Sequence, residues 1–347
     1  MTDFDKYIIL GEPDKSEKAR IWQTAIGLQD VDGLKPSGYL LKTAEKHIEG
    51  DITIDQVRDI IDTYYESKGI RQDGEREGEM EADKVSVRIT EILSEKVFSF
   101  TPDYLVSIHR RLFDGVFSHA GQFRTKNMIK HEWILDGDTV EYSPFYLIEE
   151  TLNYEFSQEK GVDYPSTQAD EALKRICRFV SGIWQIHPFM EGNTRTTAVF
   201  VMKYLQNFGF GVDNTVFKDH SWYFRNALVR NNYRNFSKGV SATSVFLERF
   251  FRNLLFGEQN RLSNREMHIA NAQSIISKSH DDTLKCTLAE MSVLTFLKDN
   301  PEAKQEEIAA HIGKSVSTVK RITPELVKRG LLERENGKRN GRWVVKF

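Results

Sequence analysis

Apolar residues recur at helical spacing along most of the chain, and this pattern predicts a mainly α-helical protein. Beyond a helix pair near the N-terminus, we expect helices over 82–93, 102–113, 172–184, 196–205, 222–232 and 243–266. The stretch 270–283 is polar and predicts a connection to a last domain.

One β signal interrupts these helices. Two runs rich in β-forming residues, 129–135 and 139–142, flank Asp136-Gly137, a dipeptide typical of hairpin turns. An isolated hairpin is only marginally stable in water, so we expect this one to pack on the helical body.

The N-terminal stretch predicts two consecutive helices. The first runs from Ser37 to Gly50 and the second from Thr53 to Tyr64, each with one apolar face and with glycine as the stop between them. Residues 66–83 are dense in charge and glycine, and they predict a solvated linker or long loop.

The C-terminal stretch predicts a winged helix-turn-helix. Helical patterns cover 307–312 and 315–327, and the segment 334–347 with its Asn-Gly turns suits a two-stranded wing. Residues 304–347 hold 11 Lys and Arg against 5 Glu and no Asp, a local charge of +6. Side chains suited to phosphate and base contacts gather at the start of the second helix, namely Ser315, Ser317, Thr318, Lys320 and Arg321. DNA binding and a protein-docking role without DNA contact both fit this pattern.

The composition is that of an ordinary soluble protein. A length of 347 residues predicts two or three domains, and 39% hydrophobic with 29% charged residues is usual for a folded chain. The net charge of −3 excludes a global basic field for nucleic acid. Cys177 and Cys286 lie far apart, which argues against a disulfide framework. We find no leader pattern and no apolar run of about 18 residues, so we expect a cytoplasmic protein without membrane contact.

The candidate chemistry lies in the loop 186–196. Pro188 disfavours a helical residue before it, so the pattern reads helix, short loop, helix. The loop contains a base, His187, an acid, Glu191, and a cation, Arg195. A helix that starts directly after Gly192 offers free N–H groups to an anion. This combination predicts phosphate chemistry.

The run His-Pro-Phe-Met-Glu-Gly-Asn-Thr-Arg over 187–195 resembles the motif of the Fic (Fic/Doc) family, whose usual form is His-x-Phe-x-Asp/Glu-Gly-Asn-Gly-Arg-x-x-Arg. Proteins of that family mostly transfer AMP from ATP to a hydroxyl side chain of a target protein. Two positions depart from the pattern: Thr194 stands where glycine is usual, and Ala198 stands where the second arginine would fall. Without the second arginine the γ-phosphate would be bound more weakly, so a nucleotide donor other than ATP remains an alternative.

The resemblance implies a Fic-type helical core, with ATP as substrate and Mg²⁺ as cofactor. His187 would accept the proton of the target hydroxyl, and Glu191 would hold the metal ion. Nucleotide binding would fall to Gly192, Asn193, Thr194, Arg195 and, on the adenosine side, Asn232. An aromatic residue near the start of the helix 222–232, Tyr223 or Phe224, could wall the pocket, although such residues are more often core.

The resemblance also assigns a role to the predicted hairpin. Residues 129–142 fall where the family has a flap that pairs with an extended segment of the target. The target-docking residues would be Ile129, Trp133, Ile134 and Leu135. The alternative is a hairpin with a purely structural role.

A further family feature is an N-terminal inhibitory helix ending in Ser/Thr-x-x-x-Glu-Gly/Asn. His47-Ile48-Glu49-Gly50 resembles the end of that motif, with Glu45 at the Ser/Thr position. Glu49 would then inhibit by repelling the γ-phosphate of ATP through like charge.

These observations predict three parts: an N-terminal helical region (1–83) with a candidate inhibitory helix (37–50), a Fic catalytic domain (84–266) and a winged-helix domain (284–347). The predicted function is protein adenylyl transfer to a Tyr, Ser or Thr hydroxyl. The alternative is a DNA-binding regulator whose Fic domain senses a nucleotide without turning it over. The predicted partners are a target protein and DNA at 304–347, and a homo-oligomer stays open.

Overall fold

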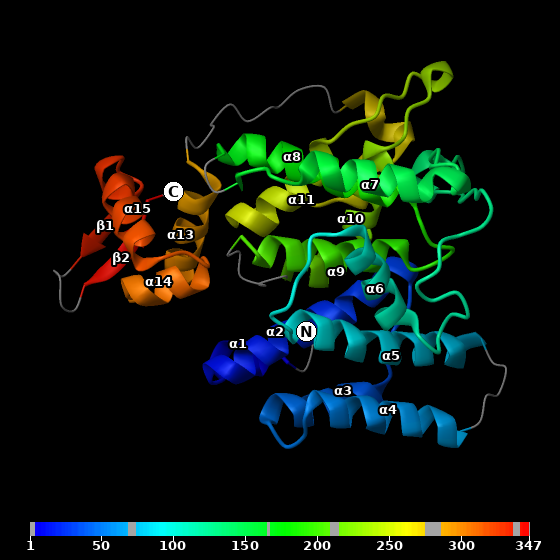
Figure 1. Ribbon diagram of the computed structural model, residues 1–347, viewed down its shortest axis with the longest axis horizontal. Helices are drawn as coiled ribbons and strands as arrows, with labels where there is room; N and C mark the ends of the chain where they lie inside the picture. Colours follow the sequence, from blue (N-terminus) through cyan, green and yellow to red (C-terminus); the bar gives the residue numbers. More distant parts are fainter. Residues whose placement is uncertain are drawn as a thin grey trace.

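The computed structural model describes residues 4–68, 74–164, 167–208, 215–274, 286–335 and 341–346. These residues are mainly helical, as the apolar pattern predicts (Figure 1). The part before the hairpin consists of α1 (Asp5–Leu10), α2 (Pro13–Gly27), the 3₁₀ turn η1 (Leu28–Asp32), α3 (Gly38–Glu49), α4 (Ile54–Lys68), α5 (Gly74–Ser94) and α6 (Pro102–Phe113). The part after it consists of η3 (Phe145–Leu147), α7 (Ile148–Glu159), α8 (Ala169–Ile186), α9 (Asn193–Gln206), α10 (Thr215–Asn231), η5 (Phe236–Lys238), α11 (Val245–Phe256), α12 (Asn264–Met267) and η6 (Ile269–Ser274).

Helix α9 is the centre of the molecule, because every residue from Asn193 to Leu205 is buried. In Figure 1 it runs between α8 and α5, and it also packs on α6. Its Phe200 packs within an aromatic cluster that includes Phe156 and Phe179. This all-round burial fixes the start of α9, where the motif lies.

The N-terminal helix pair is confirmed as α3 and α4, which form an outer layer against α2 and α5 (Figure 1). Ser37 caps α3 by accepting the N–H of Leu40 (3.1 Å), and Gly50 ends it in a left-handed conformation (φ 90°). The loop predicted over 66–83 is wrong at both ends, because α4 continues to Lys68 and α5 begins at residue 74; residues 69–73 lie outside the described chain.

Contacts from far along the sequence hold this stretch, since Glu81 in α5 pairs with Arg195 (2.5 Å). Asp83 in α5 accepts hydrogen bonds from the Ser37 N–H (2.7 Å) and from the Tyr65 hydroxyl (2.8 Å). The carboxylate therefore packs inside the molecule although its sequence neighbours are charged. As a result α5 crosses the domain boundary that we placed at residue 83.

The predicted flap, residues 129–142, turns at Asp136-Gly137, and both residues are left-handed (φ 56° and 82°). It has no regular strands within the described residues, because Trp133–Leu135 forms the 3₁₀ turn η2. Across the turn, the Glu132 N–H donates to the main-chain oxygen of Asp138 (2.9 Å). The segment thus folds back as expected, but side chains rather than a ladder of main-chain bonds hold it.

The helix predicted over 243–266 is shorter than expected. Helix α11 ends at Phe256, and Gly257 follows in a left-handed conformation (φ 63°). The Asn253 side chain then holds the loop through the N–H and carbonyl oxygen of Asn260 (both 2.8 Å). Of the predicted polar connection 270–283, residues 275–283 lie outside the described chain.

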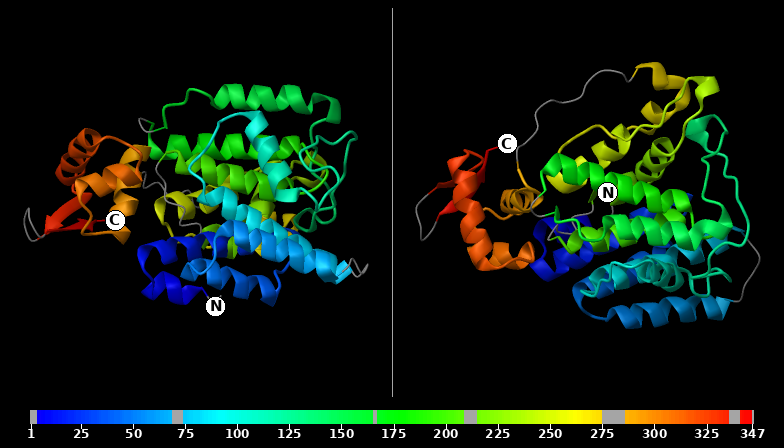
Figure 2. Two further views of the ribbon diagram at one scale, coloured as in Figure 1. Left: turned by 60° about the horizontal axis from the view of Figure 1, so that its bottom comes forward. Right: turned by 45° about the horizontal axis from the view of Figure 1, so that its top comes forward.

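The C-terminal domain contains α13 (Leu288–Asp299), α14 (Gln305–His311), α15 (Val316–Lys328) and the antiparallel strands β1 (Leu332–Glu335) and β2 (Arg342–Val345). This is the predicted winged helix; the wing residues 336–340 lie outside the described chain. Figures 1 and 2 place it at one end of the helical body. It joins that body beside α8, where the Ala169 N–H donates to the main-chain oxygen of Cys286 (2.8 Å). No described helix has the length and apolar character needed to span a membrane.

Candidate active site

The α8–α9 loop is closed by one side chain, that of Asn193. Its Oδ1 accepts the Phe189 N–H (2.9 Å), and its Nδ2 donates to the main-chain oxygen of the same residue (2.8 Å). Gly192, just before α9, is left-handed (φ 73°), and a Cβ there would lie 2.4 Å from the ring of Phe113. Only glycine fits this approach, and Asn193 holds the loop rather than pointing its amide at a ligand.

The start of α9 forms an anion cradle, by which we mean the main-chain N–H groups of residues 193–195. The first intrahelical bond here runs from the Thr196 N–H to the oxygen of Gly192 (3.0 Å). The preceding N–H groups have no acceptor within the helix and lie at its positive end. The cradle is therefore built from main-chain donors.

His187 follows α8 in a left-handed conformation (φ 51°), and its side chain is 3% exposed. Its Nδ1 lies 3.3 Å from the main-chain oxygen of Trp184, and its Nε2 is buried without a hydrogen-bond partner among the described residues. Burial lowers the pKa of the imidazole well below its ordinary value, and the charge of Lys130 lowers that pKa further. A neutral ring that donates through Nδ1 presents Nε2 as a proton acceptor.

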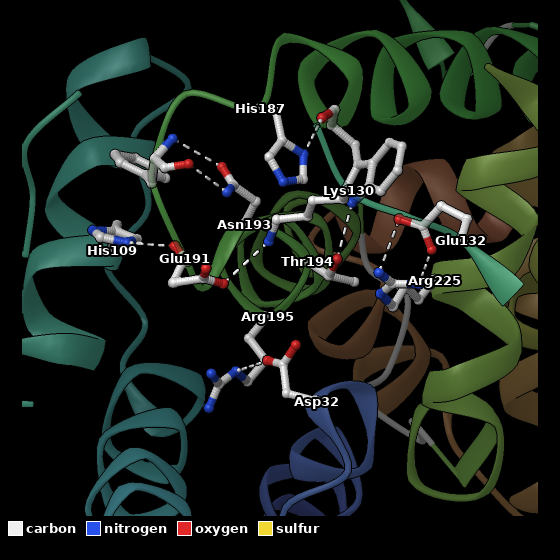
Figure 3. Close-up of polar contacts among 12 residues, drawn as sticks. Asp32, His109, Lys130, Glu132, His187, Glu191, Asn193, Thr194, Arg195 and Arg225 are labelled. Carbon is white, nitrogen blue, oxygen red and sulfur yellow. Dashed lines mark hydrogen bonds and ion pairs between the residues drawn. The ribbon is translucent and has the colours of Figure 1, made fainter. Parts of the chain in front are cut away.

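Glu191 is the exposed acid of the loop. Its side chain is 55% exposed, and one carboxylate oxygen lies 3.1 Å from Lys130 Nζ (Figure 3). The described residues contain no cluster of three or more His, Cys, Asp or Glu side chains that could hold a metal ion, at Glu191 or elsewhere. Mg²⁺ in proteins is usually held by one or two carboxylates together with phosphate oxygens and water. The donor set therefore fits a metal that arrives with a nucleotide.

Lys130 lies over the loop from the flap, and Figure 3 shows its side chain between His187 and Glu191. The ammonium neutralises the acid that would hold the metal, so Lys130→Met should lower the half-saturating Mn²⁺ concentration. A part-exposed pair is worth about 0.2–1 kcal/mol, so we expect a decrease of up to about fivefold. Electron paramagnetic resonance of free Mn²⁺ measures this, and Lys126→Met is the matched control. Equal Mn²⁺ affinity of both variants would contradict a competition at Glu191.

His109 supports the loop from α6. Its Nδ1 accepts the Gly121 N–H (2.8 Å), and its Nε2 lies 3.1 Å from the main-chain oxygen of Glu191. The ring also stacks on Phe189, with centroids 3.7 Å apart. These contacts require the neutral tautomer that donates through Nε2, and burial lowers the pKa of this histidine to about 4.

Arg195 points away from the cradle into the N-terminal region (Figure 3). Its side chain is 2% exposed and lies within 2.8 Å of Asp32, 2.5 Å of Glu81 and 3.1 Å of Gln29. All three partners come from η1 and α5. The cation that we expected on a phosphate thus ties the motif helix to the N-terminal region.

Thr194, the first departure from the family pattern, has a structural role. Its buried hydroxyl accepts the indole N–H of Trp184 (2.9 Å), which joins the end of α8 to the start of α9. Ala198, the second departure, is fully buried in the core. The position of the missing arginine therefore faces packed side chains in this chain.

Removing the acceptor at Thr194 should destabilise the protein. Thr194→Val keeps the shape but leaves the buried Trp184 N–H without a partner, which costs about 1–3 kcal/mol. Urea unfolding followed by circular dichroism gives the free energy of unfolding. Thr194→Ser keeps the hydroxyl and serves as the control. Matching unfolding midpoints for the two variants would show that the hydrogen bond contributes nothing.

The structure places Asn232 just past α10, where its Nδ2 donates to the hydroxyl of Ser181 (2.8 Å) and to the main-chain oxygen of Leu228 (3.0 Å). This amide joins α10 to α8. Tyr223 and Phe224 are buried core residues, so neither is exposed to wall a nucleotide pocket.

The remaining predicted residues divide between surface and core. On the flap, Ile129 and Trp133 are 71% and 55% exposed, whereas Ile134 and Leu135 are fully buried. Only the first two can meet a target. Glu49 is not brought to the motif, since its carboxylate pairs with Lys15 on α2 (2.7 Å). An inhibitory role for Glu49 stays a prediction.

Residues 99–205 match the Fic/DOC family, and residues 286–344 match the MarR family. The chain carries a Fic/DOC domain followed by a MarR-family domain. The first comprises α6, the flap, α7, α8 and α9, so it contains the whole motif loop.

Two curated proteins are similar to parts of this chain. One is the protein adenylyltransferase VbhT of Bartonella schoenbuchensis, 26% identical over 120 residues, which are 33% of this chain and 23% of that protein. The other is a probable protein adenylyltransferase, y4lH, of Sinorhizobium fredii, 31% identical over 128 residues, 36% of this chain and 62% of that protein. The matches thus span about a quarter and somewhat under two thirds of these relatives.

Among solved structures, a Fic family protein from Desulfovibrio desulfuricans aligns over 99% of this chain and 92% of its own. The TM-score is 0.43 and the sequence identity 15%.

Several residues of the site were not predicted from the sequence. Four of them come from other elements: His109 and Lys130 contact Glu191, and Asp32 and Glu81 contact Arg195. Each lies between 61 and 163 positions away from its contact in the sequence. No local pattern links them to the motif. For Lys130, its place in the predicted flap was the one available signal.

Proposed function

We propose that this protein is an adenylyltransferase that moves AMP from ATP to the hydroxyl of a Tyr, Ser or Thr side chain on a target protein. One observation carries the proposal most directly: His187 Nε2 is an unpartnered, neutral acceptor in the same loop as the anion cradle and Glu191. A base, an anion site and a metal-binding carboxylate are what phosphoryl-centre chemistry requires. The adenylyltransferase relatives support the reaction type.

The roles follow from the geometry. His187 accepts the proton of the target hydroxyl through Nε2, while its Nδ1 stays on the Trp184 carbonyl and fixes the tautomer. The hydroxyl oxygen bonds to the α-phosphorus, and pyrophosphate leaves. The cradle N–H groups hold phosphate oxygens as their negative charge grows. Glu191 would hold Mg²⁺, which when bound supplies charge neutralisation at the phosphates.

The side chain of Tyr142 must move aside for a target hydroxyl to reach His187. The ring of Tyr142 lies over the imidazole, with centroids 4.2 Å apart, and covers it together with neighbouring side chains. The flap itself is anchored by a buried bidentate pair between Glu132 and Arg225 of α10 (2.6 and 3.0 Å). The exposed Ile129 and Trp133 then offer apolar contacts for an extended target segment.

Labelling with two forms of ATP tests this function. The full chain is incubated with Mg²⁺ and either α- or γ-labelled ATP, alone and with a cell lysate. Adenylyl transfer leaves the α-label and no γ-label on protein. A γ-label on protein would indicate a kinase instead. The absence of both labels would refute the transferase and favour a nucleotide sensor.

A DNA-binding regulator is the second candidate, and the MarR-family match favours it. On α15 the side chains of Ser317, Lys320 and Arg321 are exposed along one face. This arrangement suits phosphate and base contacts of a recognition helix. Electrophoretic mobility of random duplex DNA tests it: a shift that weakens steeply with salt and is lost on Lys320→Glu supports DNA contact. The two functions are compatible in one chain.

A further inference from the structure

Arg124 lies at the base of the flap, and its guanidinium is buried against the loop that carries His187. Its Nε donates to the main-chain oxygen of His187 (2.8 Å), and its Nη2 donates to that of Ile186 (3.3 Å). The main-chain N–H of Arg124 donates to the oxygen of Pro188 (2.8 Å). Three successive carbonyls around the catalytic histidine therefore end on one residue.

The other side of the guanidinium holds the flap. Nη1 donates to the main-chain oxygen of Lys126 (2.8 Å), and Nη2 also donates to that of Ser143. The Ser143 N–H in turn donates to the oxygen of Gln185 on α8 (3.4 Å). One planar guanidinium thus contacts three segments: the chain on either side of the flap, at Lys126 and Ser143, and the end of α8. Its fixed fork of donors suits several acceptors at once.

The charge of Arg124 is balanced without an acid, since no carboxylate pairs with it in the part of the chain that the structure describes. Its acceptors are carbonyl groups, two of them at the C-terminus of α8. The last carbonyls of a helix lack intrahelical partners and carry its negative pole. A buried guanidinium at this point both caps the helix and finds its counter-charge there.

The backbone of His187 needs such support. A left-handed conformation is uncommon for residues other than glycine, although asparagine, aspartate and histidine adopt it more often than the rest, and it persists where the surroundings fix it. The His187 N–H donates to the Trp184 oxygen (3.0 Å), and the His187 oxygen is held by Arg124. Both ends of the residue are therefore tied, and this sets the direction of its Nε2.

We propose that Arg124 is a positioning residue for the reaction: it holds His187 in its left-handed conformation and fixes the flap to the same carbonyls. The base and the docked target segment then keep one relative geometry. Arg124 has no hydrogen bond to the cradle residues 193–195 among the described contacts, so its loss should affect turnover more than nucleotide binding. This inference deepens the proposed function, and its kinetic test rests on that function.

The kinetic test compares two arginine-to-lysine variants of the full chain. Arg124→Lys keeps the charge but replaces the fork by a single nitrogen. We expect kcat to fall about 10- to 100-fold, the scale of a displaced catalytic group, while KM for ATP changes less than about threefold. Arg252→Lys is the matched control, because Arg252 pairs with Asp170 at the opposite end of α8. An unchanged kcat, or equal losses in both variants, would overturn the proposal.

A spectroscopic test needs no activity. In wild-type protein the His187 Cε1–H signal should stay that of one neutral tautomer through the pH range in which an exposed histidine titrates, about pH 6.5; in Arg124→Lys it should titrate nearer that value. Identical titrations would overturn the proposal. If the variant does not fold, hydrogen exchange with water in the wild-type protein provides the test. The Arg124 Nη–H protons should exchange slowly because carbonyl groups accept them, and fast exchange would contradict these contacts. Absence of label from wild type would refute the transferase alone and leave this test standing.

Discussion

Replacing His187 by alanine should lower kcat for AMP transfer by about 10²- to 10⁴-fold, the usual contribution of a positioned general base. The buried Nε2 has no hydrogen-bond partner to lose within the described residues, so the change removes the acceptor without breaking a side-chain network around that atom. The cradle N–H groups belong to α9 and remain in place. KM for ATP should therefore stay within about threefold of the wild-type value.

Initial rates of α-label incorporation over a range of ATP concentrations separate the two parameters. His311→Ala in the winged helix is the control, because His311 stacks on Phe296 far along the chain from the motif. The melting temperature of each variant shows whether it is folded in the assay. A His187→Ala protein that labels its target at the wild-type rate would assign the base to another residue.

Acidification should destabilise the protein through His109. Its pKa is about 4 in the folded state against about 6.5 when unfolded, so the unfolded chain binds a proton first as the pH falls. The stabilisation is complete above pH 6.5 and is lost progressively between pH 6.5 and pH 4. Because 1.36 kcal/mol corresponds to one pKa unit, this residue alone should remove about 2 kcal/mol between pH 7.5 and pH 5.

Urea unfolding at pH 7.5 and pH 5 measures the effect. His109→Phe is the comparison, since phenylalanine can stack on Phe189 as the imidazole does but cannot titrate. The variant should start less stable and lose about 2 kcal/mol less on acidification. Other buried histidines, such as His187 and His47, contribute equally to both proteins, because burial also lowers their pKa values. A pH dependence identical in both proteins would contradict the role of His109.

The elements that could be predicted are those fixed by local signals. Helix α6 has the bounds expected from its pattern, because Thr101 caps it and Pro102 opens it. The motif loop was equally local, since His187 and Glu191 lie within five positions. The first turns of α5 were missed because a partner of this stretch lies far away: Glu81 pairs with Arg195, 114 positions along the chain.

The roles within the site were harder to predict than its location. Arg195 was expected on a phosphate, but its environment is set by Asp32 and Glu81, which no spacing rule connects to it. Thr194 was only a departure from a pattern until its hydrogen bond to Trp184 gave it a function. Sequence shows which chemical groups a loop contains, whereas distant segments decide where each group points.

Helix α8 runs from the contact with the MarR-family domain to the motif loop. At its first turn the backbone of Ala169 is bonded to Cys286 at the entrance to the MarR-family domain, and at its far end lies His187. Its 18 residues form a stiff rod about 27 Å long. A force that a bound partner exerted on the winged helix would act on one end of α8, and the imidazole of His187, the proposed base, lies at the other.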